Sequence, residues 1–522
     1  MNMYDIYICL NEGDFMELNK HICTQLVENG KEFMQLTLDD DYIVRDNKPD
    51  VIRIIYSKGT IALEDIKIGN QVVWLTGKLY FSMLYQSDDE NHRLESVNGE
   101  IPFQEKVVME TREDCESLTA DINIEDLSIG IINSRKLAIR AVLDVEVKCL
   151  EEENEEFTCA IPVEGYEQKT EELLMLCLAE NKKEMIQLQK EVLLPNSRTN
   201  IGELIFYQVD FLNEDIQLLD SRLMIQMNAK IWVLYRSEST GAYECFETTV
   251  PISGELEFYG LSGDEIFWTK VTPKDIVVEP RSDYDGESRM LGLEFGLFVE
   301  SQIYREETCE VLTDAYSLDK ELNLEREDTS FYQLLVKNIS KVRLMEQEQI
   351  EPRQEKILQI CGSSGAITID TMEKRENGVQ VEGVLNVHIL YTTTEDALPF
   401  AHAESQIPFE QFIEIPRFSV NTKVWLDYKL EQIQVNLLDS AEYEIKAVIE
   451  IGILALEENH ISNILQIEEE PLDMERVQRQ PGMIGYVKKD GEDLWDVAKK
   501  YHATAANILE IGNRVLVVKQ VH

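Results

Sequence analysis

Few groups of residues in this sequence have the types and spacing that chemistry on a substrate requires. The run Gly362-Ser363-Ser364-Gly365 resembles a nucleophile elbow at first sight, but its spacing is not the G-x-S-x-G that exposes a serine on a sharp strand-to-helix turn. Three successive acids at 39–41 lack the alternate oxygens, the glycine and the final glutamate of a calcium loop. A turn or a solvated face is the simpler interpretation of these acids. Phosphate-binding G-x-x-x-x-G-K-[ST] and zinc-binding H-E-x-x-H patterns do not occur in the sequence.

Histidine and cysteine, the usual bases, nucleophiles and metal ligands, are scattered along the chain. The histidines, which show no paired spacing, are His21, His92, His388, His402, His460, His502 and His522. The cysteines, odd in number and without a C-x-x-C pair, are Cys9, Cys23, Cys115, Cys149, Cys159, Cys177, Cys245, Cys309 and Cys361. We therefore expect reduced thiols in a cytosol, no metal ion, no cofactor and no enzymatic activity.

The charge balance narrows the class of partner. Asp and Glu number 99 against 49 Lys and Arg, a formal net charge of −50, which repels phosphate backbones and anionic lipid heads. Nucleic acid is therefore not an expected partner. Residues 480–522 differ, because they hold six basic and five acidic residues. No apolar run approaches the roughly 18 residues that span a bilayer, and the N-terminus lacks a secretory pattern, so we expect no membrane span and a cytoplasmic protein.

The elements that could position functional residues emerge from an internal repeat. Three runs place an apolar residue or glycine at every second position, which is typical of a half-buried antiparallel strand. The three runs end alike, in Leu84-Tyr85, Leu234-Tyr235 and Leu390-Tyr391. Their apolar faces comprise Val73, Leu75, Gly77, Leu79, Phe81 and Met83; Leu223, Ile225, Met227, Ala229, Ile231 and Val233; and Val379, Val381, Gly383, Leu385, Val387 and Ile389. One β-rich fold has been used three times, with its tyrosines in packing roles.

The repeat period predicts independent domains rather than a solenoid. The tyrosines are 150 and then 156 residues apart, and Pro102, Pro251 and Pro408 follow them by 17, 16 and 17 residues. We expect domains arranged like beads on a string, with an acidic connector at 151–156. Short helices are expected at 49–57, 201–206 and 354–360. Asn29-Gly30 predicts a hairpin turn.

The last segment has its own pattern. Residues 484–518 predict a strand, two helices and a strand, with the second helix running from about Thr504 to Glu510. The pattern resembles the LysM module, and the matching residues are Tyr486, Val487, Leu494, Trp495, Val497, Ala498 and Tyr501. Two departures stand out: the turn at 490–493 is one residue longer, and about ten residues that form one wall of the family's sugar groove are missing.

The shortened groove favours a protein partner over a sugar for this module. We predict partner binding by Tyr486, Lys488, Lys489, Leu494, Trp495 and Lys499. Trp495 is either a recognition aromatic or a core residue, and the lysines either meet an acidic partner or serve solubility. The alternative function is that of a LysM-type protein that binds peptidoglycan or chitin oligosaccharides.

Over residues 16–522 the chain resembles the SipL-like spore-coat morphogenesis proteins, whose repeat is called the SPOCS domain. The marks that carry the resemblance are Lys48-Pro49-Asp50-Val51, Asn133-Ser134-Arg135-Lys136, Asp283-Tyr284-Asp285-Gly286 and Gln359-Ile360-Cys361. The resemblance implies a non-enzymatic adaptor on the mother-cell side of the forespore surface. It also implies that the module binds the coat's basal scaffold protein, an ATPase.

These observations predict a mainly β protein, with α+β character minor, in five parts. They are an N-terminal extension at 1–16, SPOCS-like repeats at 17–150, 168–318 and 328–470, and a small βααβ LysM-like module at 482–522. Family members generally begin near a Met-Glu-Leu, so Met16 resembles the usual start, and residues 1–15 are either an extension or the result of an upstream start codon.

Overall fold

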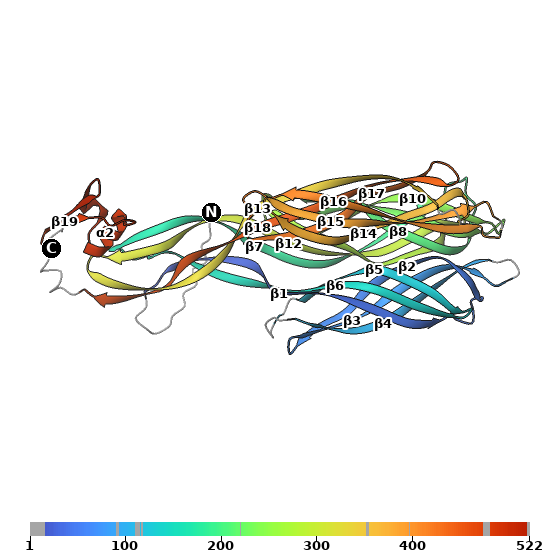
Figure 1. The fold of residues 1–522 in the computed structure, drawn as a ribbon, viewed down its shortest axis with the longest axis horizontal. Coiled ribbons are helices and arrows are strands. Elements are labelled where there is room, and N and C mark those ends of the chain that lie inside the picture. Colours follow the sequence, from blue (N-terminus) through green and yellow to red (C-terminus); the bar gives the residue numbers. More distant parts are fainter. Residues whose placement is uncertain are drawn as a thin grey trace.

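The computed structural model describes residues 16–89, 93–109, 115, 118–219, 221–350, 354–395, 397–472 and 481–518. Nearly all of their regular structure is antiparallel strand, which confirms the mainly β fold class. The molecule is elongated: a broad body of sheets continues into a narrow stalk, and a small module lies at the far end of the stalk (Figure 1).

Each repeat forms six strands in two three-stranded sheets. In repeat 1 the outer sheet has the order β1-β6-β5 and the inner sheet the order β2-β3-β4. The two sheets pack face to face, because the alternating apolar residues of β3 and β6 meet between them in one core. The strands are β1 (Asn19–Ile43), β2 (Val51–Gly69), β3 (Val72–Ser87), β4 (Leu94–Val108), β5 (Leu118–Asn133) and β6 (Lys136–Ala160).

Repeats 2 and 3 reproduce this order strand for strand. Their outer sheets are β11-β12-β7 and β13-β18-β17, and their inner sheets are β10-β9-β8 and β14-β15-β16. The strands of repeat 2 are β7 (Tyr166–Leu193), β8 (Ile201–Leu219), β9 (Arg222–Ser237), β10 (Tyr243–Glu257), β11 (Ile266–Ser282) and β12 (Ser288–Ser317). Those of repeat 3 are β13 (Lys320–Gln349), β14 (Ile357–Arg375), β15 (Gly378–Thr393), β16 (Phe400–Glu414), β17 (Thr422–Leu437) and β18 (Glu442–Pro471).

The register confirms that the three units are equivalent. Tyr85, Tyr235 and Tyr391 lie near the same end of the central inner strand, and all three are fully buried in the cores. The prolines at 102, 251 and 408 sit opposite equivalent residues of that strand. They lie within β4, β10 and β16, which are edge strands of the inner sheets. On the unpaired side of an edge strand, a missing N–H does not interrupt a hydrogen-bond ladder.

Two of the motifs that mark repeat 1 form one clasp. The carboxylate of Asp50 accepts hydrogen bonds from Ser134 Oγ and Arg135 Nη1, both at 2.7 Å. Arg135 also donates to the backbone carbonyl groups of Lys48 and Val44. The bonds from Arg135 and Ser134 hold the pKa of Asp50 below its ordinary value. The clasp ties the loop before β2 to the β5–β6 turn, and so joins the two sheets at one end.

Three local predictions are wrong. The helices expected at 49–57, 201–206 and 354–360 are the starts of β2, β8 and β14. The acidic stretch 151–156 is no connector, because it pairs with β1. Asn29-Gly30 forms an irregularity within β1 instead of a turn. In each case pairing with a strand distant in sequence overrides the local preference.

The expected domain limits fall inside strands. Positions 150, 168 and 328 lie within β6, β7 and β13, and the expected extension 1–16 lies outside the described residues except for Met16. The repeats as folded units run from β1 to β6, from β7 to β12 and from β13 to β18. Their connections are short, since β12 ends at Ser317 and β13 begins at Lys320.

A register shift in each outer sheet marks the point where a ribbon leaves the body. The shifts occur at Glu28/Gly30 in β1, at Ile303/Tyr304 in β12 and at Leu334/Val336 in β13. On the body side of each shift the sheet has three strands, whereas beyond it only a two-stranded ribbon continues. β-Bulges bend and twist strands, so the shifts let the ribbons β1–β6, β7–β12 and β13–β18 turn out of their sheets.

The three ribbons wrap around one another to form the stalk. Its buried clusters each take residues from several ribbons, for example Cys23, Phe157, Met175, Val311, Phe331 and Ile461. Side chains also bridge ribbons: Asn463 accepts from Thr158 N and donates to Glu156 O. A single two-stranded ribbon is marginally stable in water, and association buries its apolar face.

The inner sheets close a ring of repeats. β4 lies against β8, β10 against β14, and β16 against β2, so each repeat contacts the next and the third returns to the first. Residues of all three repeats share one buried cluster, in which Trp232 stacks on Phe206 at 5.7 Å and lies edge-on to Tyr56. Gly362 leaves room for Trp232, since a Cβ there would meet its indole at 2.4 Å. The repeats are therefore not beads on a string.

The prediction that the cysteines are reduced thiols is wrong for six of them. Disulfides join Cys23 to Cys177, Cys115 to Cys149 and Cys245 to Cys361. The first links repeats 1 and 2, and the third links repeats 2 and 3. Cys159 and Cys309 are free and Cys9 lies outside the described residues. Separations of 154 and 116 residues in sequence gave no sign of these pairings.

None of the described helices has the length and hydrophobicity needed to cross a membrane.

The shared cluster predicts a strong effect of its central indole. Trp232→Ala removes a side chain that is 1% exposed and should lower the free energy of unfolding by about 3–5 kcal/mol. Trp74→Ala is the matched control, because Trp74 is 38% exposed beneath Lys106 and should cost no more than about 1 kcal/mol. Urea unfolding followed by far-ultraviolet circular dichroism measures both. Equal losses would mean that the repeats do not depend on this contact.

Candidate interaction site in the C-terminal module

The C-terminal module is built on a three-stranded sheet with one helix. Its elements are β19 (Met483–Val487), α2 (Leu494–Tyr501), η1 (Ala505–Asn507), β20 (Ile508–Ile511) and β21 (Arg514–Val518), and the sheet order is β19-β21-β20. The second helix predicted from Thr504 to Glu510 is reduced to the single 3-10 turn η1. β20 takes its place because Ile508–Ile511 pairs with β21 across a turn at Gly512, whose φ is 66°.

Helix α2 is fixed at both ends by its own sequence. The Asp493 side chain caps the N-terminus by accepting a hydrogen bond from Asp496 N. The Asp496 side chain in turn accepts one from Asp493 N, which completes a capping box. His502 ends the helix in the left-handed conformation. The module's buried core consists of Val497, Ala503, Val515 and Val517. Trp495 is not part of that core.

Trp495 and Lys499 bind the stalk of their own chain. Trp495 Nε1 donates to Asp314 Oδ2 at 2.7 Å, and Lys499 Nζ contacts Asp314 Oδ1 at 2.5 Å. The Trp495 ring lies edge-on to Tyr316 with centroids 4.9 Å apart. Asp314 lies directly after a register shift near the end of β12, at the tip of the stalk. Trp495 is therefore an interface aromatic, and the interface lies within the chain, between the module and the stalk.

Further contacts complete this docking. Tyr316 OH donates to Ala503 O at 2.8 Å, and His502 Nδ1 lies 2.9 Å from Ser317 O. Lys169 of β7 pairs with Asp493 at 3.0 Å. Burial opposes ionisation of Asp314, but the bonds from Lys499 and Trp495 prevail and hold the pKa of Asp314 below its ordinary value. The helix side of the module is thus committed to the stalk.

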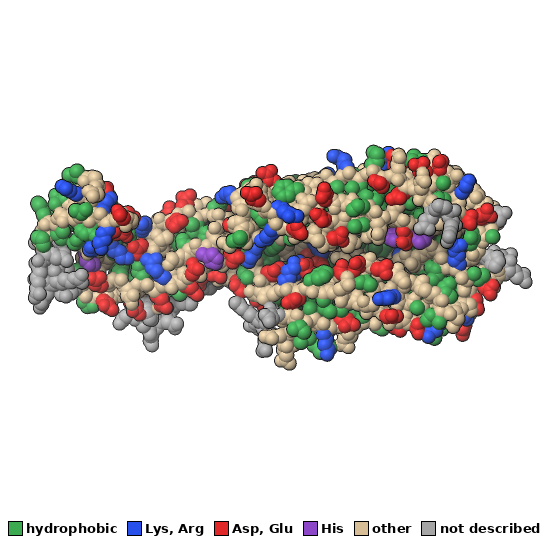
Figure 2. Space-filling model, in the orientation of Figure 1, with side chains coloured by type: hydrophobic (Ala, Val, Ile, Leu, Met, Phe, Trp, Pro, Cys, Tyr) green, Lys and Arg blue, Asp and Glu red, His purple; other side chains and the backbone are tan. Residues whose placement is uncertain are grey.

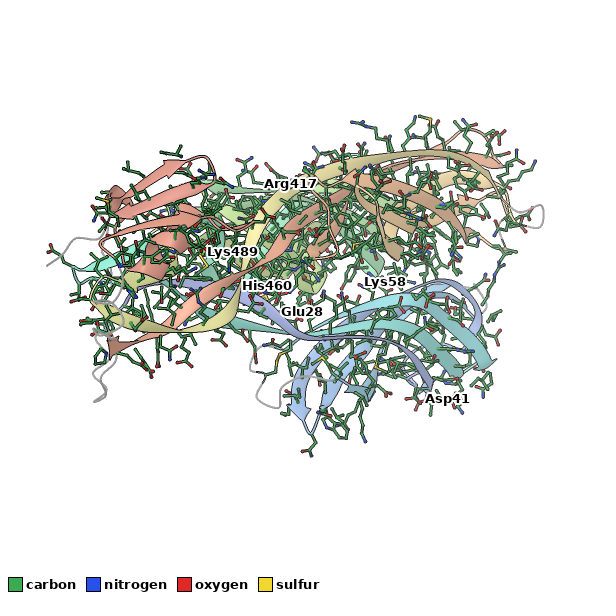
Figure 3. The ribbon with its side chains drawn as sticks, turned by 60° about the vertical axis from the view of Figure 1, so that its left-hand side comes forward. Glu28, Asp41, Lys58, Arg417, His460 and Lys489 are labelled. Carbon is green, nitrogen blue, oxygen red and sulfur yellow. A yellow bond between two sulfur atoms is a disulfide. The ribbon has the colours of Figure 1, made fainter. Side chains whose placement is uncertain are left out.

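The other predicted residues lie around the sheet and the turn before α2. Tyr486 OH donates to Glu492 at 2.8 Å and packs beneath Lys500, and Lys488 pairs with Glu510. Leu494 is partly exposed and Lys489 is exposed; Figure 3 labels Lys489 in the module. On the face shown in Figure 2, basic side chains gather near the module, whereas acidic ones are spread over the body.

Sequence reasoning missed the outer face of the module's sheet. Alternate residues of its strands point away from the module's core and remain exposed: Met483 at 65%, Val487 at 57%, Leu509 at 60%, Ile511 at 79% and Leu516 at 37%. Cross-strand pairing places Leu509 beside Leu516. We call these five residues the apolar sheet face. The signal was present as alternation in 514–518, but the prediction of a helix at 504–510 hid the strand that completes the face.

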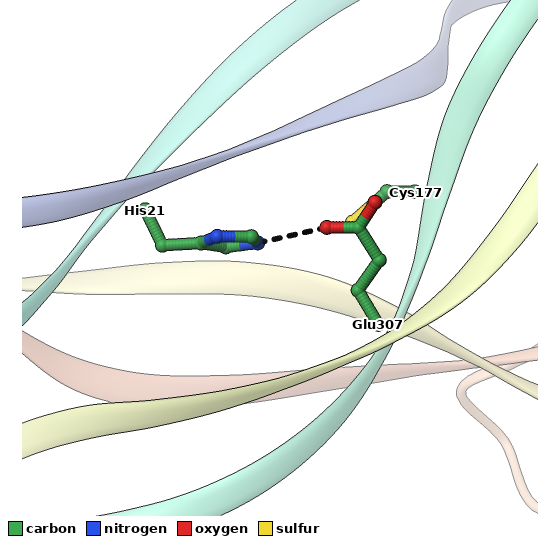
Figure 4. Close-up of side chains that lie close together, drawn as sticks. All are labelled: His21, Cys177 and Glu307. Carbon is green, nitrogen blue, oxygen red and sulfur yellow. Dashed lines mark ion pairs between the residues drawn. The ribbon is translucent and has the colours of Figure 1, made fainter. Parts of the chain in front are cut away.

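Two clusters of possible metal ligands in the described residues have a sulfur already committed. His21 Nε2 lies 3.3 Å from Glu307, with Cys177 close by (Figure 4), but Cys177 forms a disulfide with Cys23. The bond to Glu307 raises the pKa of His21. Cys115 and Cys149, near Glu151, are bonded to each other. Both arrangements are explained as covalent and ionic links of the fold.

Comparison with known families identifies the repeat. Residues 50–132 and 356–438 match the family model described as SipL, SPOCS domain. Two of the three repeats, repeats 1 and 3, thus match the SPOCS domain. The two matched segments span β2–β5 and β14–β17, which are the four strands of each sandwich between its two ribbon strands. The SPOCS match points to a sporulation-related protein.

The equivalent strands of repeat 2, β8–β11, have the same order as the SPOCS segments although the family model does not match them. No curated protein and no solved structure matches the chain.

The docking geometry predicts that Trp495→Ala leaves the module folded. The module's core does not include Trp495, so far-ultraviolet circular dichroism should be unchanged while the loss of its contacts with Asp314 and Tyr316 loosens the docking. Hydrogen exchange of the 314–317 amides should become faster by about tenfold or more. Val497→Asp is the contrasting variant, because it places a charge in the module's core and should unfold the module. Unchanged exchange in Trp495→Ala would contradict this docking.

The lowered pKa of Asp314 predicts the sign of a pH effect on docking. The carboxylate is stabilised in the docked state, so its contribution is complete above its ordinary pKa of 3.8 and is lost as pH falls through the lowered value. Asp314→Asn should therefore loosen the docking at neutral pH. As the pH falls, the docking should weaken less in this variant than in the parent protein. Exchange of the same amides at neutral and acidic pH measures this, and an identical pH profile in the variant would refute it.

Proposed function

We propose that the protein is a non-enzymatic adaptor of spore-coat assembly. In this proposal it works on the mother-cell side of the forespore surface and binds the coat's basal scaffold ATPase through its C-terminal module. The match to SPOCS segments supports the sporulation context. No nucleic acid, membrane span or cofactor enters the proposal, and the purified chain is expected neither to hydrolyse nucleotides nor to cleave peptidoglycan.

The apolar sheet face is the observation that carries the proposal. The stalk already occupies Trp495 and Lys499, so these two side chains are not available to a partner. The opposite side of the three-stranded sheet presents five exposed apolar side chains, with Arg514 between Val487 and Ile511. Contiguous exposed apolar surface marks protein interaction sites. Among the residues predicted from sequence, Lys489 is exposed and can contact a partner, whereas Trp495 and Lys499 hold the module on the stalk.

The stalk explains why such a module would be held far from the body. The residues before 480 carry the chain's net negative charge, on the stalk ribbons as well as on the body, while 480–522 hold nearly equal numbers of acids and bases. Projection to the stalk tip places the module beyond the broad body, where a large partner has room to approach the apolar sheet face (Figure 1). Fixed docking also orients the face, so less rotational freedom is lost when a partner binds.

Binding of N-acetylglucosamine oligomers is the competing outcome. A sugar site needs polar groups that satisfy the hydroxyls within a groove. The apolar sheet face presents aliphatic side chains instead, and the segment after η1 continues directly into β20. We therefore place sugar binding behind protein binding for this module.

Charge substitutions in the apolar sheet face test the proposal. Leu509→Asp and Ile511→Asp should each weaken binding of the full chain to the purified scaffold ATPase by about tenfold or more, because burying a carboxylate in an apolar contact is costly. Val420→Asp, at a site 91% exposed on the body, is the matched control and should bind normally.

Biolayer interferometry measures these affinities, with chitin oligomers offered in parallel. Unchanged scaffold binding by both face variants would remove the assigned surface. Saturable sugar binding without scaffold binding would overturn the function.

A further inference from the structure

Two histidines and a glutamate from the neighbouring strands β15 and β16 meet on the inner sheet of repeat 3. His388 lies on β15, directly opposite Glu404 of β16, and His402 lies two residues before Glu404 on the same face. Glu404 Oε1 is 2.8 Å from His402 Nε2 and 3.4 Å from His388 Nδ1. All three potential ligand atoms lie within 4.8 Å of one another. One carboxylate oxygen therefore faces two imidazole nitrogens.

The surroundings hold both rings in place. The phenol ring of Tyr56, from β2 of repeat 1, packs edge-on against His388 at 6.1 Å and His402 at 5.8 Å. His388 Nδ1 is shielded from solvent and faces Glu404 Oε1 at 3.4 Å. His402 and Glu404 line a surface cavity of about 590 Å³, which gives a small ion access from solvent. The bonds from the two imidazoles hold the pKa of Glu404 well below its ordinary value.

The fold itself does not require these residues. The register places Trp232, Cys245 and Glu247 at the equivalent positions of repeat 2, and Ser82, Ser96 and Asn98 at those of repeat 1. Cys245 forms the disulfide that links repeat 2 to repeat 3. His402 thus stands at the corresponding place in the contact between repeats 3 and 1. There the chain has imidazoles in place of a thiol or a hydroxyl group.

We propose that His388, His402 and Glu404 bind a divalent first-row transition metal ion, with Zn²⁺ as the best fit, where repeat 3 meets repeat 1. Imidazole and carboxylate are the donors that Zn²⁺ accepts, whereas Ca²⁺ and Mg²⁺ prefer sites built of oxygen alone. Metal–ligand bonds of about 2.0–2.2 Å separate tetrahedral ligands by about 3.3–3.5 Å. The observed N–O distances of 2.8 and 3.4 Å need little adjustment to reach this spacing.

Three protein ligands leave further positions of the metal ion open toward the cavity. Water or a donor group from another molecule can occupy them, as in zinc sites that keep an exchangeable ligand. Of the three possible ligand clusters in the described part of the chain, this one alone contains no disulfide sulfur. The metal ion would stabilise the β15–β16 pair beside the contact that closes the ring of repeats.

Metal titration of the full chain tests the proposal. Zn²⁺ calorimetry on the metal-free protein should reveal a site of one ion per chain, which the double variant His388→Gln/His402→Gln should lose. Each single variant should weaken that site more than about tenfold. His460→Gln is the matched control, because His460 is a surface histidine beside one carboxylate, Asp328, at 3.7 Å. It should bind like the parent protein.

Co²⁺ supplies a readout that distinguishes the ligands. Bound at this site, Co²⁺ should give visible d–d absorption without the charge-transfer band of a thiolate ligand, and the double variant should lose the absorption. Zn²⁺ should also raise the melting temperature of the parent and of His460→Gln but not that of the double variant. Equal stoichiometry and affinity in parent and double variant, or a thiolate band that persists in the double variant, would overturn the assignment.

Discussion

Closure of three equivalent contacts into a ring is the constraint on which the rest of the structure depends. The last strand of each inner sheet contacts the first strand of the next repeat's inner sheet, and the third contact returns to repeat 1. A head-to-tail contact either closes or continues into an open filament. Here three copies joined in one chain close the ring. Trp232, Phe206 and Tyr56 fill the centre that the repeats share.

The ring brings the outer sheets into a position from which their ribbons can meet. Each ribbon leaves its sheet at a register shift, and beyond that point it packs mainly against the other two ribbons. The stalk is therefore a consequence of the ring. The stalk tip in turn supplies Asp314 and Tyr316, to which the module binds. Body, stalk and module follow one another along the long axis of the molecule (Figure 1), and each provides the surface on which the next is built.

The same repetition allows chemistry to diverge at equivalent positions. The contact between repeats 2 and 3 carries a disulfide, while the contact between repeats 3 and 1 carries two imidazoles and a carboxylate. Central buried positions hold other polar groups: Lys230 donates to Ser363, and burial lowers the pKa of Lys58, labelled in Figure 3, to about 8. Three copies of one scaffold thus provide three different interfaces.

The sequence by itself determined the repeat, the mainly β class, the register of the central strands and the first helix of the module. These features follow from short-range patterns: alternation fixes which face of a strand is buried, and Asp493 and Asp496 cap α2 locally. Only the tertiary structure decided that 51–57 is strand, that cysteines 154 residues apart pair, and that Trp495 faces Asp314. It likewise decided that His388 lies opposite Glu404. The physical reason is that such contacts depend on cross-strand register and on the packing of whole repeats, and neither is encoded in the spacing of neighbouring residues.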